Sequence, residues 1–181
     1  MLVNSYNGKK IALLRPSDLA EKIAVVVSAA FDQFKINKGR RTETAMTTIG
    51  ELGHSLDYQV SCKRTCYAKA DDREWLYDQL WYVNRADNVL IRVPMALEAE
   101  FSDKEPHIDG DFQKLLMARA DVRVWLWHSL IGARKHIELY KQQIHDFDYS
   151  LPGDEWVFGA YDWTQQAVVV ERFTVPARER P

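Results

Sequence analysis

The chain has 181 residues, of which 46% are hydrophobic and 28% charged, and its formal net charge is −2. This length suffices for a core that needs no disulfide or structural metal, so we expect a single domain over residues 1–181. The nearly balanced charge argues slightly against a nucleic-acid binder, although local basic patches matter more than the total. The longest apolar stretch, residues 23–31, is too short to cross a bilayer, and the first ten residues lack the apolar segment of a signal peptide.

The two cysteines, Cys62 and Cys66, form one CxxxC pair. Zinc sites of the common kinds need a second pair of ligands at similar spacing, so this pair argues against a zinc site. So few cysteines in a chain of this length are typical of a reducing compartment. We therefore expect a soluble, cytoplasmic protein with no membrane contact.

Hydrophobic periodicity predicts two helices in the first third of the chain. Residues 17–34 begin with Ser17, a good N-cap, and carry one apolar stripe. Residues 42–57 repeat this pattern, and Gly50 and Gly53 would allow the helix to approach a sheet closely. Between the helices lies a basic loop, residues 35–41. Such a loop is either simply solvated or placed to meet a phosphate backbone.

The rest of the chain predicts strands interrupted by two helices. Residues 58–63 alternate as a strand does, and residues 74–83 and 89–101 form an antiparallel hairpin around an Asn- and Asp-rich turn. The elements expected after it are a helix opened by Asp109 or Asp111, a strand at 122–127, a helix at 133–146, and a terminal hairpin of residues 155–162 and 167–175. This order predicts an α/β fold, a mixed sheet flanked by helices, with an added N-terminal helix and a C-terminal hairpin.

Three acidic side chains interrupt the apolar strands of the predicted hairpin: Asp78, Glu98 and Glu100. Period-two geometry places Glu98 and Glu100 on one face of their strand, and antiparallel pairing can bring Asp78 beside them, at roughly 5 Å. Carboxylates so close repel one another unless a cation neutralises them. A set of oxygen ligands suits Mg²⁺ or Mn²⁺ rather than zinc. The alternative is that these residues face solvent on a one-sided sheet.

An aspartate followed some 20 residues later by Glu-x-Glu, then by a helix and an apolar strand, resembles the PD-(D/E)XK nuclease superfamily. The resemblance covers residues 42–127 and implies the restriction endonuclease-like core of that superfamily: a helix, a three-stranded meander, a crossover helix and a further strand. It implies that Asp78, Glu98 and the backbone carbonyl of Ala99 bind a metal ion. Glu100 stands where the motif usually has lysine, a variant that occurs among restriction endonucleases.

The resemblance implies two more catalytic residues outside the strands. Some variants carry the lysine on the following helix, where Lys114 is the candidate, and an acidic residue on the preceding helix often completes the site, where Glu51 fits. On a helical wheel, Lys114 lies nearly opposite the apolar face of Phe112 and Leu115, so the alternative is an exposed surface lysine. Glu51 likewise points away from the main apolar face of its helix.

The function expected from this resemblance is that of a nuclease that hydrolyses phosphodiester bonds with the help of Mg²⁺ or Mn²⁺. We expect its substrate to be DNA rather than RNA. Cutting both strands of a duplex would be served by a homodimer. The basic residues placed to contact phosphates are Lys35, Lys38, Arg40, Arg41, Lys63 and Arg64. Two alternatives remain: a nuclease-like fold without activity that serves as a binding or assembly module, and a metal-dependent hydrolase of a small phosphorylated substrate. The missing motif lysine favours the first of them.

Overall fold

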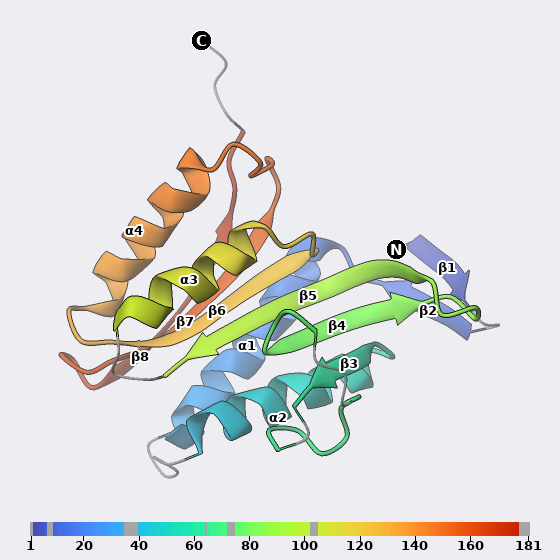
Figure 1. The fold of residues 1–181 in the computed structure, drawn as a ribbon, viewed down its shortest axis with the longest axis horizontal. Coiled ribbons are helices and arrows are strands. Elements are labelled where there is room, and N and C mark those ends of the chain that lie inside the picture. The colour runs from blue at the N-terminus through green and yellow to red at the C-terminus, as the bar shows by residue number, and fades with distance from the viewer. Residues whose placement is uncertain are drawn as a thin grey trace.

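A computed structural model describes residues 2–6, 9–34, 40–63, 65–71, 75–101 and 105–177, of which 2–6, 9–13 and 105–109 are described by their backbone alone. Six strands form one mixed sheet, in the order in which they occur along the chain (Figure 1). The strands are β3 (Gln59–Cys62), β4 (Gln79–Asn84), β5 (Leu90–Glu100), β6 (Val122–Ser129), β7 (Glu155–Asp162) and β8 (Ala167–Thr174). The central pairs β5–β6 and β6–β7 are parallel, and the outer pairs are antiparallel.

Helices cover both faces of this sheet (Figure 1). The helices are α1 (Pro16–Phe34), α2 (Arg41–Ser55), α3 (Glu105–Leu116) and α4 (Ala133–Asp146). On one face, α1 and α2 pack on a core that includes Trp81 and Leu126. On the other, α3 and α4 pack on an aromatic core that includes Trp125 and Trp127. The α/β fold predicted from the sequence, with its helix and strand order from residue 17 onward, is therefore confirmed.

The structure differs from the prediction most clearly at three places. A separate antiparallel pair, β1 (Leu2–Tyr6) and β2 (Lys9–Leu13), precedes the first helix and was not predicted. Helix α3 begins at Glu105, four residues before Asp109, because Pro106 can occupy the first turn of a helix without losing a hydrogen bond. Strand β4 begins at Gln79 rather than at residue 74, because its ladder with β3 starts at the pair Cys62–Gln79 and residues 76–78 bend away.

The pairing of β4 with β5 is interrupted close to Pro94. Trp81 pairs with Met95, but the register shifts before Val83 pairs with Arg92. Proline has no N–H to donate to a ladder, so a strand that contains one commonly bulges there. From Gln79 to Trp81 the register is regular, and it aligns the start of β4 with the acidic end of β5.

Gly159 is needed where α1 crosses β7. A Cβ at this position would lie 2.7 Å from a methyl of Val27 and 2.8 Å from one of Leu126. We expect Gly159→Ala to lower the free energy of unfolding by about 1–3 kcal/mol, because the core has no room for the added methyl group. Urea unfolding measures this change.

The matched control is Gly110→Ala in α3, where a Cβ would meet nothing within 4 Å. Alanine is favoured over glycine within a helix by about 1 kcal/mol, so this variant should be as stable as the parent or more so. Equal stabilities of the two variants would contradict the close packing of α1 on β7.

Candidate active site

Asp78, Glu98 and Lys114 line one cavity of about 200 Å³ on the face of the sheet that α3 covers. They come from three successive parts of the chain. Asp78 directly precedes β4, Glu98 lies near the end of β5, and Lys114 lies on the crossover helix α3. The other residues that line the cavity are Cys62, Lys63, Trp75, Leu76 and Tyr77. The chain therefore brings two carboxylates and two ammonium groups, those of Lys63 and Lys114, to the same opening.

Glu98 is the most enclosed of these charged groups, with only 2% of its surface exposed. Because Ala96 faces the aromatic core under α3, the strand period places the Glu98 side chain on that same face. There, Glu98 Oε1 lies 2.9 Å from the Nζ of Lys114. The same Nζ lies 2.6 Å from Oδ1 of Asp111, one turn earlier on α3. The lysine thus bridges a strand carboxylate and a helix carboxylate.

Asp78 is held at the open end of the β4–β5 ladder. Gln79 pairs with Leu97, so the residue before it stands opposite Glu98. Oδ2 of Asp78 accepts a hydrogen bond of 2.9 Å from the backbone N–H of Ala99. An extended residue directs its N–H and its C=O toward the same neighbouring strand. The carbonyl of Ala99 therefore faces the side of β5 on which Asp78 lies.

The buried carboxylate is costly to ionise. Burial, followed by the negative charge of Asp78, raises the pKa of Glu98 to about 8, although Lys114 favours the ionised form. Burial alone would lower the pKa of Lys114, but hydrogen bonds and charges from Asp111 and Glu98 outweigh it and raise that pKa. Burial, and then the charge of Glu98, also raise the pKa of the Tyr77 phenol. The negative potential at the cavity is therefore only partly balanced by Lys114.

Replacing Lys114 by methionine is expected to raise the pKa of Glu98 further, by about one unit or more, because a cation at ion-pair distance normally lowers a carboxyl pKa by 1–3 units. Titration of the Glu98 carboxyl carbon by NMR measures this. Lys135→Met, at an exposed position of α4, is the control and should leave the pKa of Glu98 unchanged. An unchanged Glu98 titration in Lys114→Met would show that the two groups are not coupled.

The sequence predicts Lys114 either in the site or on the surface. Its side chain is partly exposed, and its ammonium group nevertheless reaches the site. It is 32% exposed and starts from the polar side of α3, yet its long stem carries the ammonium group to Glu98. A helical wheel marks where a side chain leaves the helix, not where a flexible side chain of this length ends. Asp111, predicted only as a helix opener, and the cavity residues Cys62 and Tyr77 are members of the site that the sequence did not single out.

The other predicted catalytic residues lie farther out. Glu51 is on α2, on the opposite face of the sheet, 58% exposed and 4.0 Å from Lys69. Glu100 ends β5 and is half-buried. Neither lines the cavity with Asp78, Glu98 and Lys114. The structure therefore assembles the strand–strand–helix part of the predicted site without the α2 carboxylate.

Of the predicted phosphate contacts, Lys63 lies exposed at the cavity. Arg40 is 3.7 Å from Glu43, and the guanidinium of Arg41 stacks over the rings of Tyr161 and Trp163 at 5.7 and 5.0 Å. The remaining predicted contacts lie outside the described residues: Lys35, Lys38 and Arg64.

The donors at the cavity suit a hard divalent cation. In the described part of the chain, no group of three or more His, Cys, Asp and Glu side chains is placed to share an ion. Mg²⁺, however, is commonly bound by one or two carboxylates and completes its shell with water and substrate oxygens. Asp78, Glu98 and the Ala99 carbonyl form such an oxygen set. A cation there would stabilise the ionised form of Glu98, which burial and then the charge of Asp78 disfavour.

Comparison of the chain with family models, with curated proteins and with solved structures returned no match. No helix among the described residues is long and apolar enough to span a membrane.

Proposed function

We propose that this protein is a Mg²⁺- or Mn²⁺-dependent nuclease that hydrolyses phosphodiester bonds, with DNA as its substrate. The observation that supports this most is the convergence of Asp78, Glu98 and Lys114 at one cavity from three successive elements. Two acidic strand ends followed by a lysine on the crossover helix correspond to a variant arrangement of the PD-(D/E)XK superfamily, which the chain resembles in sequence. If Lys114 were only a surface lysine and the two carboxylates were unrelated, nothing would require all three to line one cavity.

In this proposal, Asp78, Glu98 and the carbonyl of Ala99 hold the divalent ion. The bound ion would polarise a phosphoryl oxygen and lower the pKa of a water ligand. Lys114 has three N–H donors and lies 2.9 Å from Glu98. It is therefore placed to hold the attacking water or to stabilise negative charge on the phosphate.

The surrounding residues are given supporting roles. Lys63 stands at the cavity and would contact the phosphate beside the one that is cut. Arg40 and Arg41 would contact phosphates farther along the strand. Glu100 and Glu51 lie outside the cavity, so the chemistry is assigned to Asp78, Glu98 and Lys114 without them.

The test is cleavage of a circular plasmid, a single-stranded DNA and an RNA, each with Mg²⁺, with Mn²⁺, and with a chelator. We expect metal-dependent products from at least one DNA substrate, and their loss in Asp78→Asn. Asp32→Asn, at an exposed position of α1, is a carboxylate control away from the cavity. Equal products from the parent and Asp78→Asn would point to a contaminating nuclease and overturn the proposal.

A second candidate is a nuclease-like fold that binds a partner without chemistry. It is favoured by the contact of Lys114 with both Glu98 and Asp111, which places a cation on the carboxylate that the metal ion would use. Calorimetric titration with Mn²⁺ separates the two candidates. Ion binding that disappears in Asp78→Asn supports the nuclease, and no binding supports the module.

A further inference from the structure

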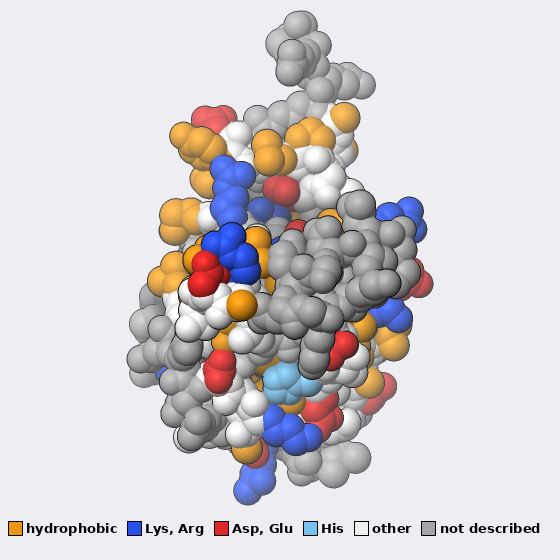
Figure 2. Space-filling view, turned by 90° about the vertical axis from the view of Figure 1, so that its right-hand side faces the viewer, with side chains coloured by type: hydrophobic (Ala, Val, Ile, Leu, Met, Phe, Trp, Pro, Cys, Tyr) orange, Lys and Arg blue, Asp and Glu red, His pale blue; other side chains and the backbone are white. Residues whose placement is uncertain are grey.

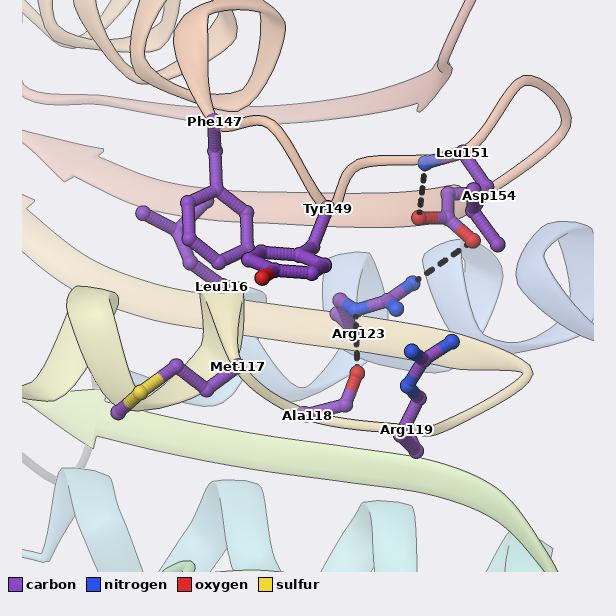
Figure 3. A pocket seen from close by; sticks show the side chains of 9 residues that line it. All are labelled: Leu116, Met117, Ala118, Arg119, Arg123, Phe147, Tyr149, Leu151 and Asp154. Carbon is purple, nitrogen blue, oxygen red and sulfur yellow. Dashed lines mark hydrogen bonds and ion pairs between the residues drawn. The ribbon is translucent and has the colours of Figure 1, made fainter.

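A second cavity, of about 180 Å³, opens between the end of α3 and the loop that follows α4 (Figure 3). Its lining includes Leu116, Met117, Arg119, Arg123, Phe147 and Tyr149. Pockets for drug-sized molecules hold about 300–1,000 Å³. This cavity therefore suits one ring-sized group of a larger ligand rather than a whole ligand.

One wall of the cavity is aromatic and exposed. Phe147 and Tyr149 lie together on the loop, with ring centroids 5.7 Å apart, and Figure 3 shows both rings above Met117 of the opposite wall. Tyr149 is 72% exposed. A tyrosine left open to water offers a flat surface on which another ring can stack, at little cost in side-chain entropy.

The loop that carries these rings is fixed by hydrogen bonds. The Ser150 N–H donates to the Phe147 carbonyl at 3.0 Å, and the Leu151 N–H donates to the Asp154 carboxylate at 3.0 Å. Asp154 and Val175 are joined through the backbone at 2.9 Å. A prearranged loop loses little conformational freedom when a ligand binds. The exposed aromatic wall is thus preorganised before a ligand binds.

The other side of the cavity is cationic. The buried Arg123 donates from Nε to the Ala118 carbonyl at 3.0 Å, and its guanidinium lies 5.4 Å from the Trp156 ring centre. Its Nη1 is 3.4 Å from Asp154, longer than the roughly 2.7–2.9 Å of a charge-assisted hydrogen bond. Arg119 adds an exposed guanidinium. Two positive charges against one negative charge leave this wall able to accept an anion.

The two cavities are neighbours. Lys114 on α3 lines the first, and Leu116 and Met117, two and three residues later, line the second. The Tyr77 phenol lines the first cavity and is close enough to Arg123 of the second for that charge to influence its pKa. A strand of nucleic acid bound at Asp78 and Glu98 would therefore reach the second cavity within a short distance.

The surface viewed in Figure 2 shows Lys and Arg side chains interspersed with Asp and Glu, with hydrophobic side chains beside them in its upper part. Mixed charges of this kind give no broad attraction for a polyanion. Affinity for nucleic acid on this face would have to come from local contacts. Stacking on an aromatic ring is such a contact, because every base has a flat face whatever its sequence.

We propose that the second cavity binds one base of a single-stranded nucleic acid, stacked on Tyr149 and Phe147, with the adjoining phosphate held by Arg119 and Arg123. The bases of a duplex are paired and stacked, and one can enter such a cavity only after it leaves the helix. The inference rests on the proposed function and extends it, since it selects single strands or unpaired ends as the substrate presented to Glu98.

Binding of a fluorescein-labelled 12-nucleotide DNA, followed by anisotropy in the presence of a chelator, tests this inference without requiring cleavage. We expect Tyr149→Ala to weaken binding about tenfold, within the range that base stacking contributes, whereas Tyr149→Phe retains the ring and the affinity. Arg119→Ala should weaken binding and reduce its salt dependence. Arg134→Ala, at an exposed position of α4, should do neither.

Several outcomes would overturn the inference. These are equal affinity for the 12-mer and for its duplex, no effect of Tyr149→Ala, or AMP binding as tightly as the 12-mer, which would assign the cavity to a free nucleotide. A different result would contradict the nuclease proposal alone. In that case the protein would bind the 12-mer in a way that depends on Tyr149 but would form no product with any metal. Conversely, if Tyr149→Ala cleaves single strands with an unchanged KM, the nuclease proposal stands and the proposed base-binding cavity is rejected.

Discussion

Replacing Glu98 by glutamine is expected to lower metal-dependent cleavage by at least roughly 100-fold, because even residues that only support a metal ligand typically contribute 10- to 100-fold. Glutamine keeps the size of the side chain and removes the charge that the divalent ion would neutralise. Single-turnover cleavage at saturating Mn²⁺ is the measurement. Since Glu98 is only 2% exposed and costly to ionise, the variant should remain folded.

Two comparisons make this expectation specific. Glu138→Gln, on the exposed face of α4 beside Lys141, removes a carboxylate elsewhere and should leave the cleavage rate unchanged. Circular dichroism and thermal unfolding of Glu98→Gln establish that the fold is retained. A folded Glu98→Gln protein that cleaves within a few-fold of the parent would remove Glu98 from the site.

The free energy of unfolding of the metal-free protein is expected to fall as the pH rises from about 4.5, the ordinary pKa of a glutamate, to about 8, the raised pKa of Glu98. In this window the folded protein holds a proton on Glu98 that the unfolded chain has lost. The folded state therefore binds more protons, and stability falls with pH. The loss should amount to a few kcal/mol and level off above pH 8.

Urea unfolding of the parent and of Glu98→Gln at several pH values isolates this contribution, because the remaining titrating groups are common to both proteins. The stability of the variant relative to the parent should increase toward pH 8. Mg²⁺ or Mn²⁺ should restore stability to the parent at high pH and not to the variant. Parallel pH profiles of the two proteins would show that the Glu98 carboxyl titrates normally.

The apolar periodicity of the sequence was sufficient to predict the fold from residue 17 onward. The central strands β5, β6 and β7 are buried and read as apolar runs, and α4 was predicted with the bounds that it has, Ala133–Asp146. The sequence also predicted that antiparallel pairing can bring Asp78 beside Glu98. Their alignment depends on the register shifts between Trp81 and Asn84, which periodicity does not locate. In the structure they stand opposite each other at the end of the β4–β5 ladder.

Other features depend on information that periodicity does not carry. Periodicity does not reveal the β1–β2 hairpin, because its strands are short, although Asn7-Gly8 between them is a typical hairpin signal. Trp75, Leu76 and Tyr77 are apolar enough to predict an earlier start of β4, yet they line the cavity. The second cavity joins residues from α3, β6 and the loop after α4, a contact set by packing rather than by any local pattern.

The six strands lie in the sheet in the order in which they leave the ribosome. Each strand pairs with the strand before it in the sheet, so a hairpin turn, the connection of residues 63–78 or a single crossover helix has to close before each pairing forms. The entropic cost of closure rises only slowly with the length of such connections. Asp78, Glu98 and Lys114 fall within one stretch of fewer than 40 residues, built from β4, β5 and α3. Low contact order of this kind favours rapid folding. The candidate site thus belongs to a continuous segment that can assemble before the C-terminal strands β7 and β8 have been made.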